Sequence, residues 1–102
     1  MNIQITSRKF RAKDTLKDHI IKKINSLEKF NSHIMDVNVI LSFTHLKDSI
    51  KTLEIVLTIP GKVLSVSDSS DDFRKSLDKA VDKLEKQLRK VKTKITTKPK
   101  VK

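Results

Sequence analysis

The chain has 102 residues, which is enough for one hydrophobic core and too few for two. It has no Cys, which excludes disulfides and thiolate sites, and a single Gly, which excludes the Gly-rich loops that bind nucleotide phosphates. With 23 basic and 12 acidic residues the formal charge is +11, and this charge favours a polyanionic partner. The first ten residues alternate instead of forming an apolar signal, so we expect a cytoplasmic protein without a membrane partner.

The positive charge gathers at the two ends of the sequence. Residues 1–30 carry a net charge of +5, residues 31–73 carry −3, and residues 74–102 carry +9. The last stretch, KTKITTKPKVK, is too polar to pack on a core. We therefore expect one domain over residues 1–94, followed by a basic, flexible tail over 95–102.

The first two predicted elements are a strand and a helix. In residues 2–7, apolar and polar side chains alternate, which indicates a strand with one buried face. Over residues 14–30, apolar side chains recur every three or four positions, as on one face of a helix: Leu16, Ile20, Ile24 and Leu27. Thr15 and Asp18 have the spacing of a capping box, and we expect the helix to end at Asn31–Ser32.

Three more strands follow, over residues 36–43, 50–59 and 62–67, because apolar side chains alternate with polar ones in each. The polar segment 45–49 predicts the turn between the first two of them. Pro60-Gly61 predicts a tight turn before the third, since Pro fixes φ at one corner and Gly supplies a positive φ at the next. These strands are expected to form an antiparallel meander.

A second, long helix is predicted to start in the segment formed by Ser69, Ser70, Asp71 and Asp72. Ser69 lies three residues before Asp72, the spacing of a capping box. The apolar positions that follow fall in one sector of a helical wheel: Phe73, Leu77, Ala80, Val81, Leu84, Leu88 and Val91. The predicted order of elements is β-α-β-β-β-α, and each of its two helices has one apolar face to bury. The predicted fold is therefore an α+β, two-layer domain with both helices packed on one face of a four-stranded sheet.

Five lysines form a line along the second helix, here called the basic stripe: Lys75, Lys79, Lys83, Lys86 and Lys90. Three acidic residues form the neighbouring acidic edge: Asp78, Asp82 and Glu85. One interpretation is a solvated face with i,i+4 pairs from Asp82 to Lys86 and from Glu85 to Arg89. The other is that lysines with no acid among them repel one another and bind a row of phosphates.

Further basic residues lie on the first helix, opposite its apolar face, and in the segment that leads into it: Lys22, Lys29, Arg8, Lys9, Arg11 and Lys13. If the two helices lie side by side, these groups frame a cleft. The chain has no Trp or Tyr to stack on unpaired bases, and its 19 Lys outnumber its 4 Arg. These features favour recognition of phosphate positions on structured RNA over sequence readout.

The sequence contains no convincing catalytic or metal-binding pattern. His19, His33 and His45 fall on different predicted segments, and none has a second ligand at metal-binding spacing on its own segment. Asp71 and Asp72 are better explained as helix caps than as an acid/base pair. We predict a protein that is not an enzyme and that uses no cofactor and no metal.

The segments MNIQITSRKF, LKDHIIKKINSLEKF and DDFRKSLDKAVDKLEKQLRKVKTK resemble the bacterial ribosome hibernation-promoting and ribosome-associated inhibitor proteins. The resemblance covers residues 1 to about 94 and is most specific from Asp82 to Lys90. Two positions depart from the family pattern, since Arg74 stands where Tyr is usual and Ser76 where Ala is usual. The chain has neither the acidic tail of the inhibitor subtype nor the dimerising domain of the long subtype, so it resembles the short form.

The resemblance implies a domain lodged in the mRNA and tRNA channel of the small ribosomal subunit, where it inhibits translation by occlusion and stores inactive ribosomes under stress or in stationary phase. It implies rRNA contacts by Lys22, Lys23, Lys29, Lys83, Lys86 and Lys90. With the rest of the basic stripe and Arg89, the predicted RNA-binding residues are Lys22, Lys23, Lys29, Lys75, Lys79, Lys83, Lys86, Arg89 and Lys90.

The expected partners are thus the small ribosomal subunit and its rRNA, with no small-molecule substrate and no membrane, and the free protein is expected to be a monomer. Two alternatives stay open. One is a stand-alone double-stranded RNA-binding domain, since basic domains with helices on a sheet also bind duplexes. The other is a basic nucleoid or assembly protein.

Overall fold

A computed structural model describes residues 1–43 and 50–101 of the chain, with side chains as far as Val91. The elements follow the predicted order β-α-β-β-β-α, with a short 3-10 helix, η1, after the first α-helix. Their bounds are β1 (Asn2–Ser7), α1 (Asp14–Asn25), η1 (Ser26–Lys29), β2 (Asp36–Phe43), β3 (Lys51–Ile59), β4 (Lys62–Ser70) and α2 (Phe73–Val101). This arrangement confirms the predicted α+β class.

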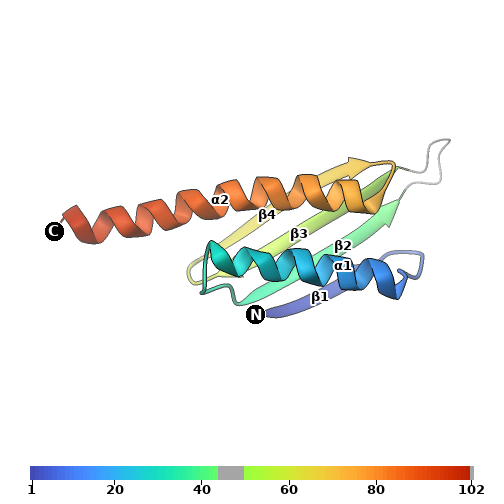
Figure 1. Ribbon diagram of the computed structural model, residues 1–102, viewed down its shortest axis with the longest axis horizontal. Coiled ribbons are helices and arrows are strands. Elements are labelled where there is room, and N and C mark those ends of the chain that lie inside the picture. Colours follow the sequence, from blue (N-terminus) through green and yellow to red (C-terminus); the bar gives the residue numbers. More distant parts are fainter. Residues whose placement is uncertain (44–49, 102) are drawn as a thin grey trace.

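The four strands form one sheet in the order β1-β2-β3-β4. β2, β3 and β4 are antiparallel neighbours, as predicted, and β1 pairs with β2 in parallel. The parallel pairing is possible because α1 carries the chain back along the sheet before β2 begins. Both helices cover the same face of the sheet (Figure 1). Gly61, between β3 and β4, has a φ of 77°, the positive value predicted for this turn.

The core lies between the helices and one face of the sheet. Alternate side chains of β2, β3 and β4 are buried there, under the predicted apolar faces of both helices. Leu16 and Val91, at the ends of those faces, are half-buried. In the described part of the chain no helix covers the opposite face of the sheet, where the strands carry Asp36 and Glu54 and no Lys or Arg.

The start and end of α1 differ from the prediction. The helix begins at Asp14, and its N-cap residue Lys13 makes no side-chain capping hydrogen bond. Thr15 therefore lies inside the first turn, and the predicted capping box with Asp18 is wrong, because a capping residue must precede the helix. The α-helical part ends at Asn25, and the chain continues as η1 to Lys29 instead of remaining α-helical to residue 30.

The start of α2 also differs, because β4 extends to Ser70 instead of ending at residue 67. Ser69, predicted to cap the helix, belongs to β4, where its hydroxyl lies 2.9 Å from that of Thr52. Asp72 caps α2 instead, since its carboxylate accepts a 2.9 Å hydrogen bond from the backbone N–H of Arg74. The predicted capping box is therefore wrong, and the helix begins at Phe73, after the four residues that were predicted to start it.

Two predictions concern segments that this structure does not test. The turn predicted over residues 45–49 lies outside the described residues, and so does His45. α2 continues to Val101, through the segment predicted to be a tail. The division of the chain at residue 94 therefore stays a prediction.

Ser76, one of the two departures from the family pattern, is completely buried at the start of α2. Its hydroxyl donates a 2.9 Å hydrogen bond to the backbone carbonyl of Lys51 in β3 and lies 3.0 Å from the hydroxyl of Ser70 in β4. A buried hydroxyl with partners avoids the cost of an unsatisfied polar group. This residue thus links α2 to two strands. Arg74, the other departure, is exposed.

Candidate nucleic-acid interface

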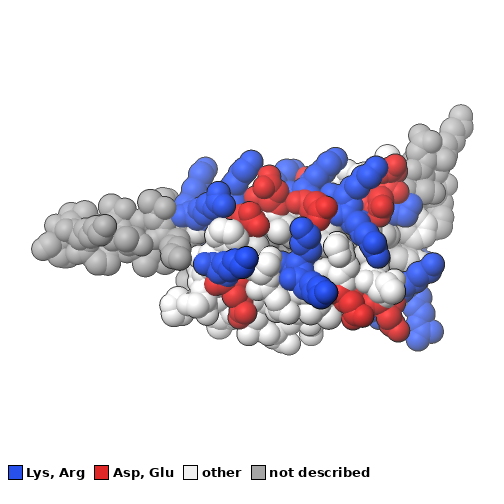
Figure 2. All heavy atoms as spheres, viewed as in Figure 1, with Lys and Arg blue, Asp and Glu red and all other residues white. Residues whose placement is uncertain are grey.

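The nine predicted RNA-binding residues all belong to α1, η1 and α2, on the side of the sheet that the helices cover. Eight of them are exposed, and Lys23 is half-buried. Figure 2 shows basic side chains over both helices, with acidic side chains between them. The helix side of the molecule therefore carries the positive charge of the candidate interface.

The basic residues of the two helices do not frame the predicted cleft, because the acidic edge of α2 faces α1. Asp78 of that edge forms a 3.3 Å ion pair with Lys23 of α1. On the opposite side of α2, Lys83 forms a 2.8 Å ion pair with Asp68 of β4, the edge strand. The basic stripe thus lies along the β4 edge of the sheet, and the lysines of the first helical segment form a separate group.

Four of the nine candidates have a carboxylate partner: Lys23 with Asp78, Lys75 with Asp71 at 3.3 Å, Lys83 with Asp68, and Lys86 with Asp82 at 3.5 Å. The contact between Lys86 and Asp82 confirms the predicted i,i+4 pair. The prediction that no acid lies among the stripe lysines is wrong, because Asp68 and Asp71 reach the stripe from outside α2. A helical wheel of α2 cannot include them.

The ion pair of Lys83 and Asp68 is the most enclosed of the four. The Asp68 side chain is 16% exposed, whereas the acids of the other three pairs are at least 58% exposed. The hydrogen bond from Lys83 is the main reason that the pKa of Asp68 lies below its ordinary value of 3.8. The Lys83 ammonium also lies 3.4 Å from the carbonyl oxygen of Ser67. Through these two contacts Lys83 links α2 to β4, the edge strand.

Four other candidates form no ion pair with a carboxylate of the described residues: Lys22, Lys29, Lys79 and Lys90. All four are exposed. Arg89 is engaged differently, since its guanidinium carbon lies 5.1 Å from the centre of the Phe30 ring, within the range of a cation–π contact. The four lysines are thus the candidates whose charge is most available to a polyanion.

The fold also gathers basic residues that the sequence does not place together. A cavity of about 460 Å³ at the start of both helices is lined by four basic residues, Arg11, Lys13, Lys51 and Arg74, and by one acid, Asp72. The predicted cleft would have set Arg11 and Lys13 beside Lys22 and Lys29, and the structure instead sets them beside the first residue of β3 and the start of α2. Because Lys51 and Arg74 are distant from residue 11 in sequence, no local pattern indicates this cluster.

The described residues include no group of three or more His, Asp or Glu side chains arranged to hold a metal ion. His19 is half-buried on α1, and His33 is exposed in the segment before β2. No described helix has a stretch long and apolar enough to cross a lipid bilayer.

Solved structures that are similar to this one include the following two. A ribosomal subunit interface protein from Coxiella burnetii superposes with a TM-score of 0.83 at 27% identity, over 91% of this chain and 99% of that chain. The N-terminal domain of Protein Y from Thermus thermophilus gives a TM-score of 0.79 at 27% identity, over 89% of this chain and 99% of that chain. No curated protein matches the sequence.

The family described as "Sigma 54 modulation protein / S30EA ribosomal protein" matches residues 3–96, which is nearly the whole chain. The match includes α1, all of the sheet except Asn2 at the start of β1, and all described side chains of α2. It agrees with the resemblance found in the sequence and with the two similar structures. The chain therefore belongs to this family of ribosome-binding, non-enzymatic proteins, which includes the hibernation-promoting factors.

Proposed function

We propose that this chain binds the small ribosomal subunit through its rRNA, occupies the channel used by mRNA and tRNA, and inhibits translation by excluding both. Ribosomes held in this way are stored inactive under stress or in stationary phase. The family membership supports ribosome association, and so does the similarity to a ribosomal subunit interface protein. The chain needs no catalytic group for this function, because occlusion depends on binding alone.

The observation that carries the proposal is the line of exposed lysines on the β4 side of α2. Lys79 and Lys90 form no ion pair with a carboxylate of the described residues, so each lacks a counter-charge in direct contact within that part of the chain. A phosphate backbone supplies this missing counter-charge and releases condensed cations when it is neutralised. Because ammonium groups act as point charges, such contacts fix position without reading sequence.

We assign the phosphate contacts to two groups of residues. The first group lies on α2 and comprises Lys75, Lys79, Lys86, Arg89 and Lys90. The second group consists of Lys22 on α1 and Lys29 on η1, beyond the acidic edge of α2. Lys23 and Lys83 add positive charge to the same surface, but Asp78 and Asp68 hold them, so their contribution to RNA affinity should be smaller.

The proposal is tested by sedimenting purified small subunits with the protein, and by measuring translation in vitro. We expect cosedimentation, inhibition of translation, and displacement of the protein when mRNA and initiator tRNA are added together. A stand-alone duplex binder or a nucleoid protein would bind free double-stranded RNA or DNA as tightly as the subunit. Binding to the subunit that persists unchanged at saturating mRNA and tRNA would contradict occlusion of the channel.

A further inference from the structure

A groove between α2 and β4 places a lysine without an acidic partner over an apolar floor. Two cavities, of about 400 and 340 Å³, share the side chains of Lys62 and Val91 and together form this groove. Lys62 is the first residue of β4 and follows the Pro60-Gly61 turn. Volumes of this size accommodate small ligands or single building blocks of larger ones.

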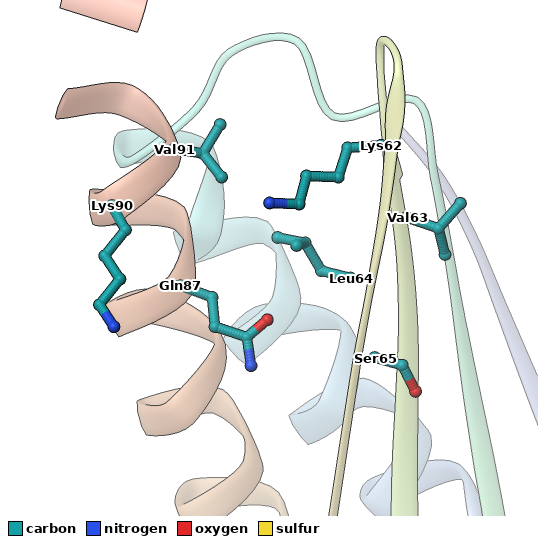
Figure 3. A pocket seen from close by; sticks show the side chains of 7 residues that line it. All are labelled: Lys62, Val63, Leu64, Ser65, Gln87, Lys90 and Val91. Carbon is teal, nitrogen blue, oxygen red and sulfur yellow. The ribbon is translucent and has the colours of Figure 1, made fainter. Parts of the chain in front are cut away.

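The larger cavity combines charged, amide and apolar groups (Figure 3). Lys62 reaches from β4 toward α2, so that its ammonium lies near Val91 and Leu64, and the amide of Gln87 enters the same space from α2. Lys90, from the basic stripe, also lines the cavity, but its ammonium lies on the outer side of α2, away from Lys62. No Asp or Glu is among the described residues that line either cavity. The groove therefore attracts an anion.

The smaller cavity extends the groove past the β3–β4 turn. Asn31 and His33 line it together with Ile59. Asn31 is 9% exposed, and its side-chain carbonyl accepts a 2.8 Å hydrogen bond from the backbone N–H of His33, which fixes the orientation of the amide. Hydrogen-bonding groups thus line this end of the groove, beside the apolar floor.

We propose that this groove takes one unpaired nucleotide of the RNA that binds along the basic stripe. Its phosphate would bind to Lys62, its base would lie against Leu64 and Val91, and the Gln87 amide would pair with the edge of the base. The inference rests on the proposed function and adds base recognition to it. From the sequence we expected phosphate contacts alone, because the chain has no Trp or Tyr on which a base could stack. In the structure, the aliphatic side chains of Leu64 and Val91 form a floor against which a base can lie.

Continuity with the basic stripe favours a nucleotide over an acidic peptide as the occupant. Lys90 belongs both to the stripe and to the cavity wall, so a strand bound along α2 passes the mouth of the groove. A primary amide presents a donor and an acceptor in one plane, which matches the edge of a base. A carboxylate-bearing peptide would use Lys62 but leave the Gln87 amide without a specific partner.

Heteronuclear NMR of the whole chain tests the inference without ribosomes. The protein is titrated with each of the four nucleoside monophosphates, with ribose 5-phosphate as the ligand without a base, and with a short Glu-rich peptide. We expect shifts at Lys62, Leu64 and Gln87 with at least one nucleotide, and weaker binding of ribose 5-phosphate and of the peptide. Lys62→Ala should weaken nucleotide binding about fivefold or more.

Two further variants separate base recognition from charge. Gln87→Leu keeps the size of the side chain and should remove the preference among the four bases while leaving ribose 5-phosphate binding unchanged. Lys13→Ala removes one exposed lysine at the N-terminal end of α1. It should change neither the preference among the bases nor the binding of ribose 5-phosphate. Each of three results would overturn the inference: no shifts in the groove at millimolar nucleotide, equal binding of ribose 5-phosphate, or tighter binding of the peptide.

The outcome is distinguishable from that of the proposed function. If the protein binds the small subunit but no nucleotide in the groove, the function stands and this inference fails. If nucleotides bind in the groove but the small subunit is not bound, the proposed function fails and the groove remains a nucleotide site.

Discussion

The ammonium of Lys83 lies 2.8 Å from the carboxylate of Asp68 and joins the middle of α2 to the edge strand of the sheet. Lys83 is also the central member of the basic stripe. The residues on either side of it in the stripe differ in their surroundings, because Lys79 has no carboxylate partner among the described residues, whereas Lys86 pairs with Asp82. Neighbouring lysines of one stripe therefore differ in whether their charge is held by an acid of the fold or is left available to a partner.

The Asp68 pair predicts a loss of stability in acid. The folded state lowers the pKa of Asp68, mainly through the hydrogen bond from Lys83, so the carboxylate stabilises the fold above its ordinary pKa of 3.8. This contribution disappears as the pH falls through the lower folded-state value. Denaturant unfolding of the parent and Asp68→Asn proteins, measured from about pH 7 to pH 2, should give free energies that converge at low pH. A constant difference would contradict the role given to Asp68.

Lys83 and Lys79 should differ in their effect on stability. Lys83→Ala leaves Asp68 without its partner and should lower the free energy of unfolding by about 1 kcal/mol. Lys79→Ala removes an exposed lysine and should change it by less than about 0.5 kcal/mol. Urea midpoints at neutral pH measure both changes. Equal effects of the two substitutions would mean that the pair with Asp68 contributes nothing specific.

Unpaired lysines of the helical layer should control the salt dependence of ribosome binding. Lys22→Ala/Lys79→Ala/Lys90→Ala should reduce the slope of log K against log salt by about 0.7–0.9 per phosphate contact removed. Removal of residues 95–102 is the matched control, because it also deletes three lysines, Lys98, Lys100 and Lys102. We expect the truncation to reduce this slope less than the triple substitution does. A truncation that abolishes binding while the triple variant binds normally would locate the interface elsewhere.

Leu84, which is completely buried under the centre of α2, should be essential for stability. Leu84→Ala leaves a cavity between α2 and the sheet and should cost about 2–5 kcal/mol. Ile21→Ala is the control, since Ile21 is 38% exposed on α1 and should cost far less. Denaturant unfolding followed by circular dichroism measures both. A cost below about 0.5 kcal/mol for Leu84 would be inconsistent with the buried face of α2.

Ser76→Ala introduces the residue usual in the family and should nevertheless destabilise this chain. It removes the hydrogen bond to the Lys51 carbonyl and the contact with the Ser70 hydroxyl, at a cost of about 1 kcal/mol. The exposed hydroxyl of Ser67 serves as the control, because Ser67→Ala removes no side-chain hydrogen bond found among the described residues. An unchanged or raised stability of the Ser76 variant would show that the hydroxyl only fills space.

Most of the fold was predictable because each element has a clear hydrophobic period. The strands follow from alternation, and the buried face of α2 from positions such as Leu77 and Leu84. Helix caps were less predictable, since Ser69 has the spacing of a cap but is held in β4 by pairing with Thr52. Local spacing cannot decide between these two states, because the strand pairing that prevails is a tertiary contact.

The candidate interface was predictable in composition and less so in arrangement. The basic stripe follows directly from helical spacing, but the partners of Lys83 and Lys23 lie on other elements. Lys62 has no sequence signal beyond its place after Pro60-Gly61, because its cavity exists only where α2 passes β4. Spacing within one element therefore identifies candidate residues, and packing between elements decides which of them are available.

The uncovered face of the sheet and the helical layer differ in charge, and this difference gives the molecule an electric dipole. Its strands present Asp36 and Glu54 and no basic side chain, whereas the helical layer on the other side carries the unpaired lysines. The resulting dipole points across the thickness of the domain, so the field of a polyanion turns the helices toward it and the sheet away before any contact forms. We therefore expect such pre-alignment to raise the rate of productive encounters with a polyanion at low salt.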